Sequence, residues 1–295
     1  EEGRLLRRVA ETLDGEQALA MQRLAAAWSE RNLAVFRACC GELAGYVAEA
    51  ALACEAPDRP AESAEGALGT LKEALKFGAV DKRRAMSALN ERLDRSTQEL
   101  MRRIIDANGL FGDSGARIEQ RLQDFQVKGA IPFDERSGAL AGAVVSGALG
   151  GLAADALSGG LTLGGGMIAG GILGALGGSV LAKGYRMVGG GGRPSVRWTT
   201  VFLARLLRQA LLRYLAVAHF GRGRGEYRDL ELPGHWSDAV DAALERERDA
   251  VDEAWRLAEQ NGSDGAARLK STLGGAIERT LRSILREAYP ETPDL

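Results

Sequence analysis

One stretch, residues 138–182, limits the possible folds of this chain more than any other feature. It holds fifteen glycines and a single charged residue, Asp155. Each glycine in a water-exposed helix costs about 1 kcal/mol relative to alanine, so fifteen of them would be strongly unfavourable there. In lipid the backbone must satisfy its own hydrogen bonds, which favours the helical form despite the glycines. The composition therefore predicts a segment that is shielded from water.

The glycines of this stretch recur at every fourth position, which places small residues along one face of a helix. Repeated small residues at this spacing let two helix backbones approach closely, as membrane helices do. The predicted packing face comprises Gly138, Gly142, Ser146, Gly150, Ala154, Gly166, Gly170, Gly174, Gly178 and Ala182. The predicted lipid-facing side comprises Leu140, Val144, Leu152, Ile168, Ile172, Leu176 and Val180. This pattern is a glycine zipper, and it predicts a helical hairpin.

The lengths of the two halves fit a bilayer. Residues 138–157 and 161–182 give two spans of about 30 Å each, close to the thickness of the hydrocarbon core. Ser158-Gly159-Gly160 supplies a turn between them, and Asp155 is predicted to lie at the tip, where its carboxylate reaches headgroups or water. A functional role for Asp155 in insertion or conduction remains an alternative interpretation.

The apolar side chains favour insertion only weakly. Six Leu and Val residues in the first span and eight Leu, Ile and Val residues in the second contribute about −2 to −5 kcal/mol per span. Because this free energy of insertion is small, we expect the two spans to insert together as a pair, or to insert only when triggered. The alternative is a hairpin that is buried inside a soluble protein.

Charge is unevenly distributed around the hairpin. Residues 183–225 contain nine basic residues and no acidic residue, whereas residues 226–295 carry a net charge of −7. Basic residues that flank a span keep that end in the cytoplasm, and they attract anionic lipids. We therefore expect the cytoplasmic face of an inner membrane as the partner surface. The expected interface anchors are Lys183, Tyr185, Arg186, Arg193, Arg197, Arg205 and Arg208.

The rest of the chain reads as all-α, without convincing strand alternation. We expect three parts: a long helical hairpin or bundle over residues 1–128, the glycine-zipper hairpin over residues 129–193, and C-terminal helices over residues 194–295. In the first part, Asp14 is a candidate cap for a helix that ends near Ala56. A second long helix begins between Glu62 and Gly69 and ends at Asn108-Gly109 in a left-handed cap. The two helices should pack antiparallel.

The C-terminal part begins with a glycine-rich joint, residues 189–192, which is expected to be flexible. A basic helix over residues 196–220 follows, and it fits either a membrane interface or a protein core with a basic edge. Acidic helices over residues 236–288, the first expected to span 236–260, are predicted to pack on the basic helix or on the first long pair.

No catalytic constellation was found. The two histidines lack partners at metal-ligand spacing, no phosphate-binding loop occurs, and no cofactor or metal is predicted. Nucleic acid is not an expected partner, because the chain is slightly acidic. Cys39, Cys40 and Cys54 are expected to be small core residues rather than a disulfide framework. An enzyme is the least expected class for these residues.

Three segments resemble part of a known family. The stretch from Gly138 to Gly164, the arginine- and leucine-rich helix from Leu203 to Gly221, and the helix end from Leu100 to Phe111 carry the resemblance. They are similar to the region of unknown function that follows the GTP-binding domain in a group of bacterial GTPases of the Era/Ras-like type. The resemblance implies that a nucleotide site lies in an upstream domain, and no catalytic residue carries over to this chain.

The expected function is therefore a membrane anchor: a helical domain that inserts its glycine-zipper hairpin into a bacterial inner membrane and couples an attached module to it. One alternative is a helical pore-forming protein of the colicin kind. Another is a soluble helical scaffold whose hairpin packs internally or in a homo-oligomer.

Overall fold

The structure is a computed structural model, and it describes residues 2–55, 69–110, 185–190, 193–220, 235–260 and 265–288. Its order of elements is α1 (Glu2–Glu11), α2 (Gly15–Leu52), β1 (Cys54–Glu55), α3 (Gly69–Ala107), β2 (Tyr185–Gly190), β3 (Arg193–Trp198), α8 (Thr200–Phe220), α9 (Trp236–Arg246), α10 (Arg248–Glu259) and α11 (Gly265–Ala288). Most described residues are helical, so the predicted helical class is confirmed in its broad form.

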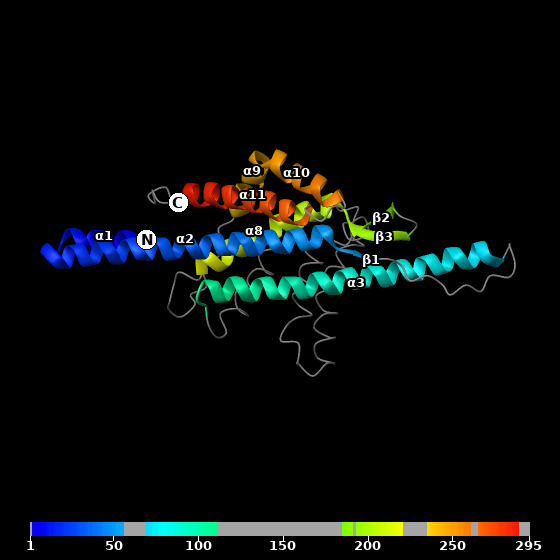
Figure 1. The fold of residues 1–295 in the computed structure, drawn as a ribbon, viewed down its shortest axis with the longest axis horizontal. Coiled ribbons are helices and arrows are strands. Elements are labelled where there is room, and N and C mark those ends of the chain that lie inside the picture. The colour runs from blue at the N-terminus through cyan, green and yellow to red at the C-terminus, as the bar shows by residue number, and fades with distance from the viewer. Residues whose placement is uncertain are drawn as a thin grey trace, which may run out of the picture.

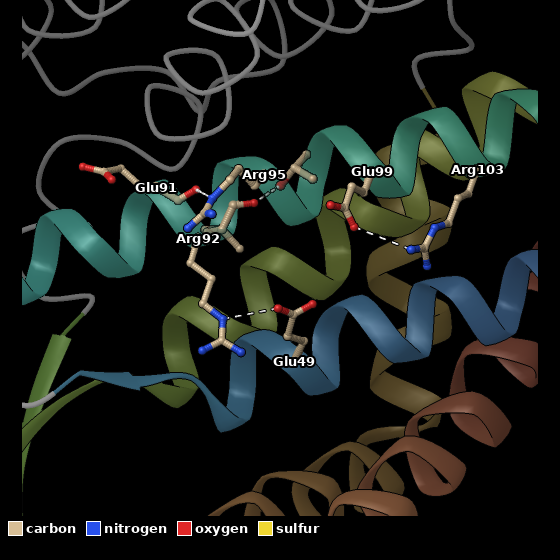
Figure 2. Close-up of polar contacts among 8 residues, drawn as sticks. Glu49, Glu91, Arg92, Arg95, Glu99 and Arg103 are labelled. Atoms are coloured by element: carbon tan, nitrogen blue, oxygen red, sulfur yellow. Dashed lines mark hydrogen bonds and ion pairs between the residues drawn. The ribbon is translucent and has the colours of Figure 1, made fainter.

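Helices α2 and α3 form the predicted antiparallel pair. Arg92 of α3 donates to Glu49 of α2 at 3.3 Å, and Arg103 of α3 donates to Glu42 at 2.8 Å. Figure 2 shows Arg92 reaching across to Glu49, while Arg103 also contacts Glu99 on its own helix. Both pairs are open to solvent, which screens their attraction, so they contribute little to stability. Their main effect is to set the register of α3 against α2.

One hydrophobic core joins the long pair to the C-terminal helices. The C-terminal half of α2 is largely buried, from Phe36 to Ala51, whereas its N-terminal half is mostly exposed. Helices α8, α10 and α11 contact this buried half, and α8 also contacts α3 and α9 (Figure 1). Among the largest buried side chains are Phe202, Leu43, Leu89, Ile104, Leu206, Leu207, Leu211, Leu269, Leu273 and Ile277. The acidic helices thus pack both on the basic helix and on the long pair, as predicted.

The prediction of an all-helical chain is wrong in one respect. The structure contains a three-stranded antiparallel sheet with the strand order β1-β3-β2. Strand β3 covers residues 193–198, so the helix expected over 196–220 begins only at Thr200. Buried Val196 and Trp198 alternate with half-buried Ser195 and Arg197, which is the period of a strand that packs one face on a core.

Two further expectations about helix ends are wrong. The expected helix over residues 236–260 is interrupted at Glu247, where α9 ends and α10 begins. No Gly or Pro marks this break, but the Glu247 carboxylate accepts two hydrogen bonds from Nε and one from Nη2 of Arg279 on α11. Asp14 precedes α2 at the cap position, yet its side chain makes no capping hydrogen bond.

Helix α1 and the exposed half of α2 form an extension beyond the core (Figure 1). Ala10 and Ala25 are buried in this extension. Leu5, Leu19 and Leu24 are exposed along it. The extension therefore retains apolar surface that the core does not cover.

Candidate functional site

The apolar hairpin, its packing face, its lipid-facing residues, its tip residue Asp155 and the anchor Lys183 lie outside the described residues. What the structure describes is how the protein holds the chain on both sides of that segment. The last described residue before it is Leu110, and the first after it is Tyr185. We call the two ends the α3 attachment (residues 108–110) and the sheet attachment (β2 and β3).

The α3 attachment ends in the predicted left-handed cap. Gly109 has a φ of +67°, a conformation that residues with a side chain adopt only at a cost. The Gly109 N–H donates to Asp106 O at 3.0 Å, and the Leu110 N–H donates to Ile105 O at 3.2 Å. This pair of bonds is the Schellman motif, which satisfies carbonyls that a helix end otherwise leaves unbonded. Leu110 also packs against the core.

Asn108 ties this attachment to α2. Its Nδ2 donates to Ile104 O at 2.8 Å and lies 3.7 Å from the sulfur of Cys39. Burial raises the pKa of Cys39 to about 11 and that of Cys40 to about 12, so both are inert thiols, as expected of core residues. Cys54 differs from this expectation, because it is exposed on β1.

The sheet attachment replaces the expected flexible joint with hydrogen-bonded strands. Tyr185 pairs with Trp198, and the register continues to Gly190 opposite Arg193, so only two residues connect the strands. Those two residues are glycines, and Gly-Gly at this position is a hairpin signal. The expectation of flexibility is therefore wrong for Gly189 and Gly190, which are paired in β2, whereas residues 191 and 192 lie outside the described residues.

Trp198 secures this sheet to the core. Its side chain is 2 % exposed and stacks on Phe202 of α8, with ring centroids 3.9 Å apart and an angle of 11° between the planes. It also lines a small hollow with Ala53, the residue after α2, and with Leu89 of α3. The chain therefore returns from the apolar segment into a strand that is packed against the end of the α2–α3 pair.

The two attachments lie at different levels of this pair. Asn108 is beside Cys39, and Trp198 is beside Ala53. These two positions are fourteen residues apart on α2, or about 20 Å along the helix axis. The two attachments thus lie near opposite ends of the buried half of α2.

The predicted interface anchors fall into three groups. By the register, positions 186, 193 and 197 share the sheet face opposite buried Val196 and Trp198, and Arg186 lies directly across from Arg197. Arg205 is exposed on α8. Arg208 is engaged in the protein: its Nε and Nη2 donate to Asp241 of α9 at 2.6 and 3.0 Å, and Nη2 also donates to Ser237.

One polar cluster escaped the sequence analysis. Arg213 of α8 is 3 % exposed, and neither its Nε nor its Nη1 has an acceptor among the residues that the structure describes. Tyr46 of α2 and Thr97 of α3 share a buried 2.8 Å hydrogen bond nearby, and Asp94 of α3 has a buried Oδ1 without a donor. The available signal was the position of Arg213 between Leu212 and Tyr214, in a run that is apolar on both sides.

A surface groove of about 360 Å³ lies on α11 and is lined by Arg279, Arg282, Ser283, Arg286 and Glu287. Arg279 binds Glu247, and Arg282 binds Glu278, so glutamates offset much of its positive charge. Within the described ranges, none of the helices combines the length and the apolar composition that crossing a bilayer requires.

Comparison with known proteins identifies the family of the chain but no individual relative. No curated protein and no solved structure gave a significant match. A family match does extend over residues 1–285, which is nearly the whole chain. The protein therefore belongs to the family described as Domain of unknown function (DUF3482).

Proposed function

We propose that this domain attaches to the cytoplasmic face of a bacterial inner membrane by inserting residues 138–182. The observation that carries the proposal is a stretch of 45 residues with one charge, joined on both sides to a folded core. A flexible tail with this composition would only tether the protein. Here a packed strand begins three residues after the segment, so insertion would also orient the core.

The charge near the sheet attachment supports an anionic partner surface. Arg186, Arg193 and Arg197 share one face of the sheet by register, and α8 begins next to it. Near a negatively charged leaflet, each basic residue contributes about 1 kcal/mol to membrane attraction. Val201, which is 61 % exposed in the first turn of α8, adds an exposed apolar side chain three residues after the sheet.

The resemblance to the region that follows GTP-binding domains supports a further part of the proposal. In this reading, the domain is the output half of a nucleotide-driven switch, and the attached module changes how strongly the core holds the membrane. A comparison of vesicle binding by the joined protein in GTP and in GDP tests this part. Equal binding in the two nucleotides would remove it and leave the anchoring role intact.

Flotation on vesicles of phosphatidylglycerol and phosphatidylethanolamine tests the anchor itself. We expect the full chain to float, and we expect Ile172→Asp to reduce flotation at least ten-fold, because a charge within the span is expensive. Leu24→Asp is the matched control, since Leu24 is 49 % exposed on α2 and lies outside the segment.

Other outcomes identify the alternatives. A full chain that stays at the bottom of the gradient, monodisperse without detergent, identifies a soluble scaffold with an internal hairpin. Release of a trapped dye from the vesicles identifies a pore-forming protein. If Ile172→Asp and Leu24→Asp reduced flotation equally, residues 138–182 would not be the part of the chain that binds the vesicles.

A further inference from the structure

One side of α2 carries a repeat that the core of the protein does not use. Seven positions recur at alternating intervals of three and four residues, the spacing by which two helices pack in a coiled coil. All seven side chains are exposed, and five of them are alanine or leucine. We call this stripe the α2 seam: Gln17, Ala20, Leu24, Ala27, Arg31, Ala34 and Ala38. The spacing and the exposure together indicate a face that fits a second helix.

The described elements that pack on α2 lie on its other sides. Phe36 and Leu43, which enter the core, point away from the seam by helical geometry. Helix α1 lies against Ser29 through Gly3 and runs beside the buried Ala25, and neither of these α2 positions belongs to the seam (Figure 1). The seam spans about 30 Å, and its small side chains let a second helix approach closely. The apolar pattern alone does not specify which helix that is.

Charged residues of alternating sign border one edge of the seam. Glu16, Arg23, Glu30 and Arg37 are spaced seven residues apart, and each directly precedes a seam position. All four are exposed, and the first three form no ion pair with any residue that the structure describes. The contact of Arg37 is long and exposed, since its Nε lies 4.0 Å from Oε1 of Glu278 on α11. In coiled coils, charges in this flanking position pair across the interface and set the orientation of the partner.

A second copy of α2 that runs antiparallel complements all four charges. In one register, Arg23 faces Glu30 of the second copy, and Glu16 faces Arg37 of the second copy. The two-fold symmetry of a homodimer repeats each contact, so both pairs form twice. The same register places Leu24 of both copies next to the symmetry axis, where the two helices bury it.

Other arrangements of the same two helices lose this match. A shift of one heptad in one direction places Arg23 opposite Arg37, and a shift in the other direction places Glu16 opposite Glu30. Facing like charges are unfavourable, so the charges select one antiparallel register. In a parallel pair, three of the four charges would face apolar residues: Met21, Trp28 and Val35.

We propose that the α2 seam is a homodimer interface, in which two chains pack α2 antiparallel with Arg23 against Glu30 and Glu16 against Arg37. Charge complementarity identifies a second copy as the occupant, because the pattern of signs matches itself in reverse. Arg37 exchanges its long contact with Glu278 for Glu16 of the other chain. The dimer does not rest on the proposed membrane anchor, since its interface contains none of residues 138–182.

Charge reversal tests the interface. Analytical ultracentrifugation of the full chain in a non-ionic detergent should give a dimer that dissociates on dilution. Arg23→Glu, which sets a glutamate against Glu30 twice, should lower the association constant about ten-fold or more. Adding Glu30→Arg to the same chain restores opposite charges and should recover the association constant to within about two-fold. Arg102→Glu, at an exposed position of α3, is the control and should have no effect.

A mixture of the two single variants tests the register. Arg23→Glu chains and Glu30→Arg chains each repel their own kind, but a dimer of one with the other has opposite charges in both central pairs. We expect heterodimers to outnumber the homodimers by about ten-fold or more, counted by native mass spectrometry with an isotope label on one chain. Heterodimers in statistical proportion would overturn the proposed pairing.

Disulfide formation tests the orientation. With the exposed Cys54 changed to serine, chains with Gln17→Cys and chains with Ala34→Cys are oxidised separately and together. The antiparallel register brings position 17 to position 34 of the other chain, and it keeps the two copies of position 17 about 25 Å apart along the helix axis. We therefore expect covalent dimers in the mixture. An equal yield from Gln17→Cys alone would indicate a parallel pair and overturn the proposal.

Leu24→Asp separates this proposal from the proposed function. A charge at the centre of the seam should abolish the dimer, yet the chain should still float on vesicles. A chain that is monomeric at every concentration, or a dimer that Arg23→Glu does not weaken, overturns the interface and leaves the anchor. An unsubstituted chain that forms a dimer sensitive to Arg23→Glu but does not float supports the interface and removes the anchor.

Discussion

The α3 attachment and the sheet attachment hold the same segment in opposite ways. At the α3 attachment, the amide groups of Asn108, Gly109 and Leu110 are all bonded, and the turn closes on its own helix. The sheet attachment is instead packed on α8, a helix that contains the unbalanced charge of Arg213. The first end is thus held by hydrogen bonds within its own helix, and the second by the packing of Trp198 on another helix. The comparison indicates that single substitutions should affect the two ends to different extents.

The largest expected effect is on the sheet attachment. Trp198→Ala removes a buried ring that contacts the sheet, α8 and the hollow beside Leu89, so we expect a loss of about 3–5 kcal/mol in the free energy of unfolding. Urea titration measures it. Val201→Ala, three residues away but exposed, should change stability by less than about 0.5 kcal/mol. Similar small effects from both substitutions would show that the sheet is only loosely attached.

The second prediction concerns the unpaired charge itself. Arg213→Met replaces a buried cation by an apolar side chain of similar length, and we expect it to stabilise the protein by about 1–4 kcal/mol. Arg208→Met is the matched substitution on the same helix, and it should not stabilise, because it breaks the ion pair with Asp241. Thermal unfolding compares the two. A destabilised Arg213→Met chain would mean that the guanidinium is already balanced.

A substitution in the α3 attachment should change the free energy of unfolding by a smaller amount. Gly109→Ala forces a side chain into the left-handed conformation and should cost about 1–2 kcal/mol. The same change at Gly41, inside α2 and facing open space, should instead stabilise by about 0.5–1 kcal/mol. Opposite signs in urea unfolding support the cap, and equal signs would contradict it.

The smallest effect depends on pH. The folded-state pKa of Asp94, about 6, lies above its ordinary value of 3.8, so the native protein binds this proton more tightly than the unfolded chain. Stability from this group is present below about pH 4 and is lost as the pH rises through about 6. Because the carboxyl group is partly solvated, we expect a loss of about 1 kcal/mol. The neutral Asp94→Asn variant should therefore exceed the native chain in stability at pH 7.5 and match it near pH 4.

The helical parts of this fold were accessible from the sequence because their signals are local. Asn108-Gly109 is a sufficient stop signal, and the apolar periodicity of α2 and α3 sets their lengths. The break at Glu247 was not accessible, since its bonds to Arg279 come from a helix 32 residues away. The sheet was missed for a different reason: β2 ends in glycines that suggested a linker, and Val196 and Trp198 gave only two alternating positions.

The candidate site also contains parts that local sequence signals predict and parts that depend on contacts between distant residues. Sequence reasoning found the apolar segment and the basic residues that flank it, because both depend on composition. It could not find the cluster of Arg213, Asp94 and Tyr46, whose members come from three helices and are separated by up to 167 positions. Nor could it distinguish Arg208, which is bound to Asp241, from Arg205, which is exposed.

The cysteines give the protein a simple chemistry of its own. With Cys39 and Cys40 buried and hard to ionise, Cys54 on the edge of the sheet is the thiol that reagents can reach. Alkylation should therefore stop at one equivalent per chain, and air oxidation should give covalent dimers but no longer chains. A single dye added to the native protein would report from beside Arg197, without any engineering.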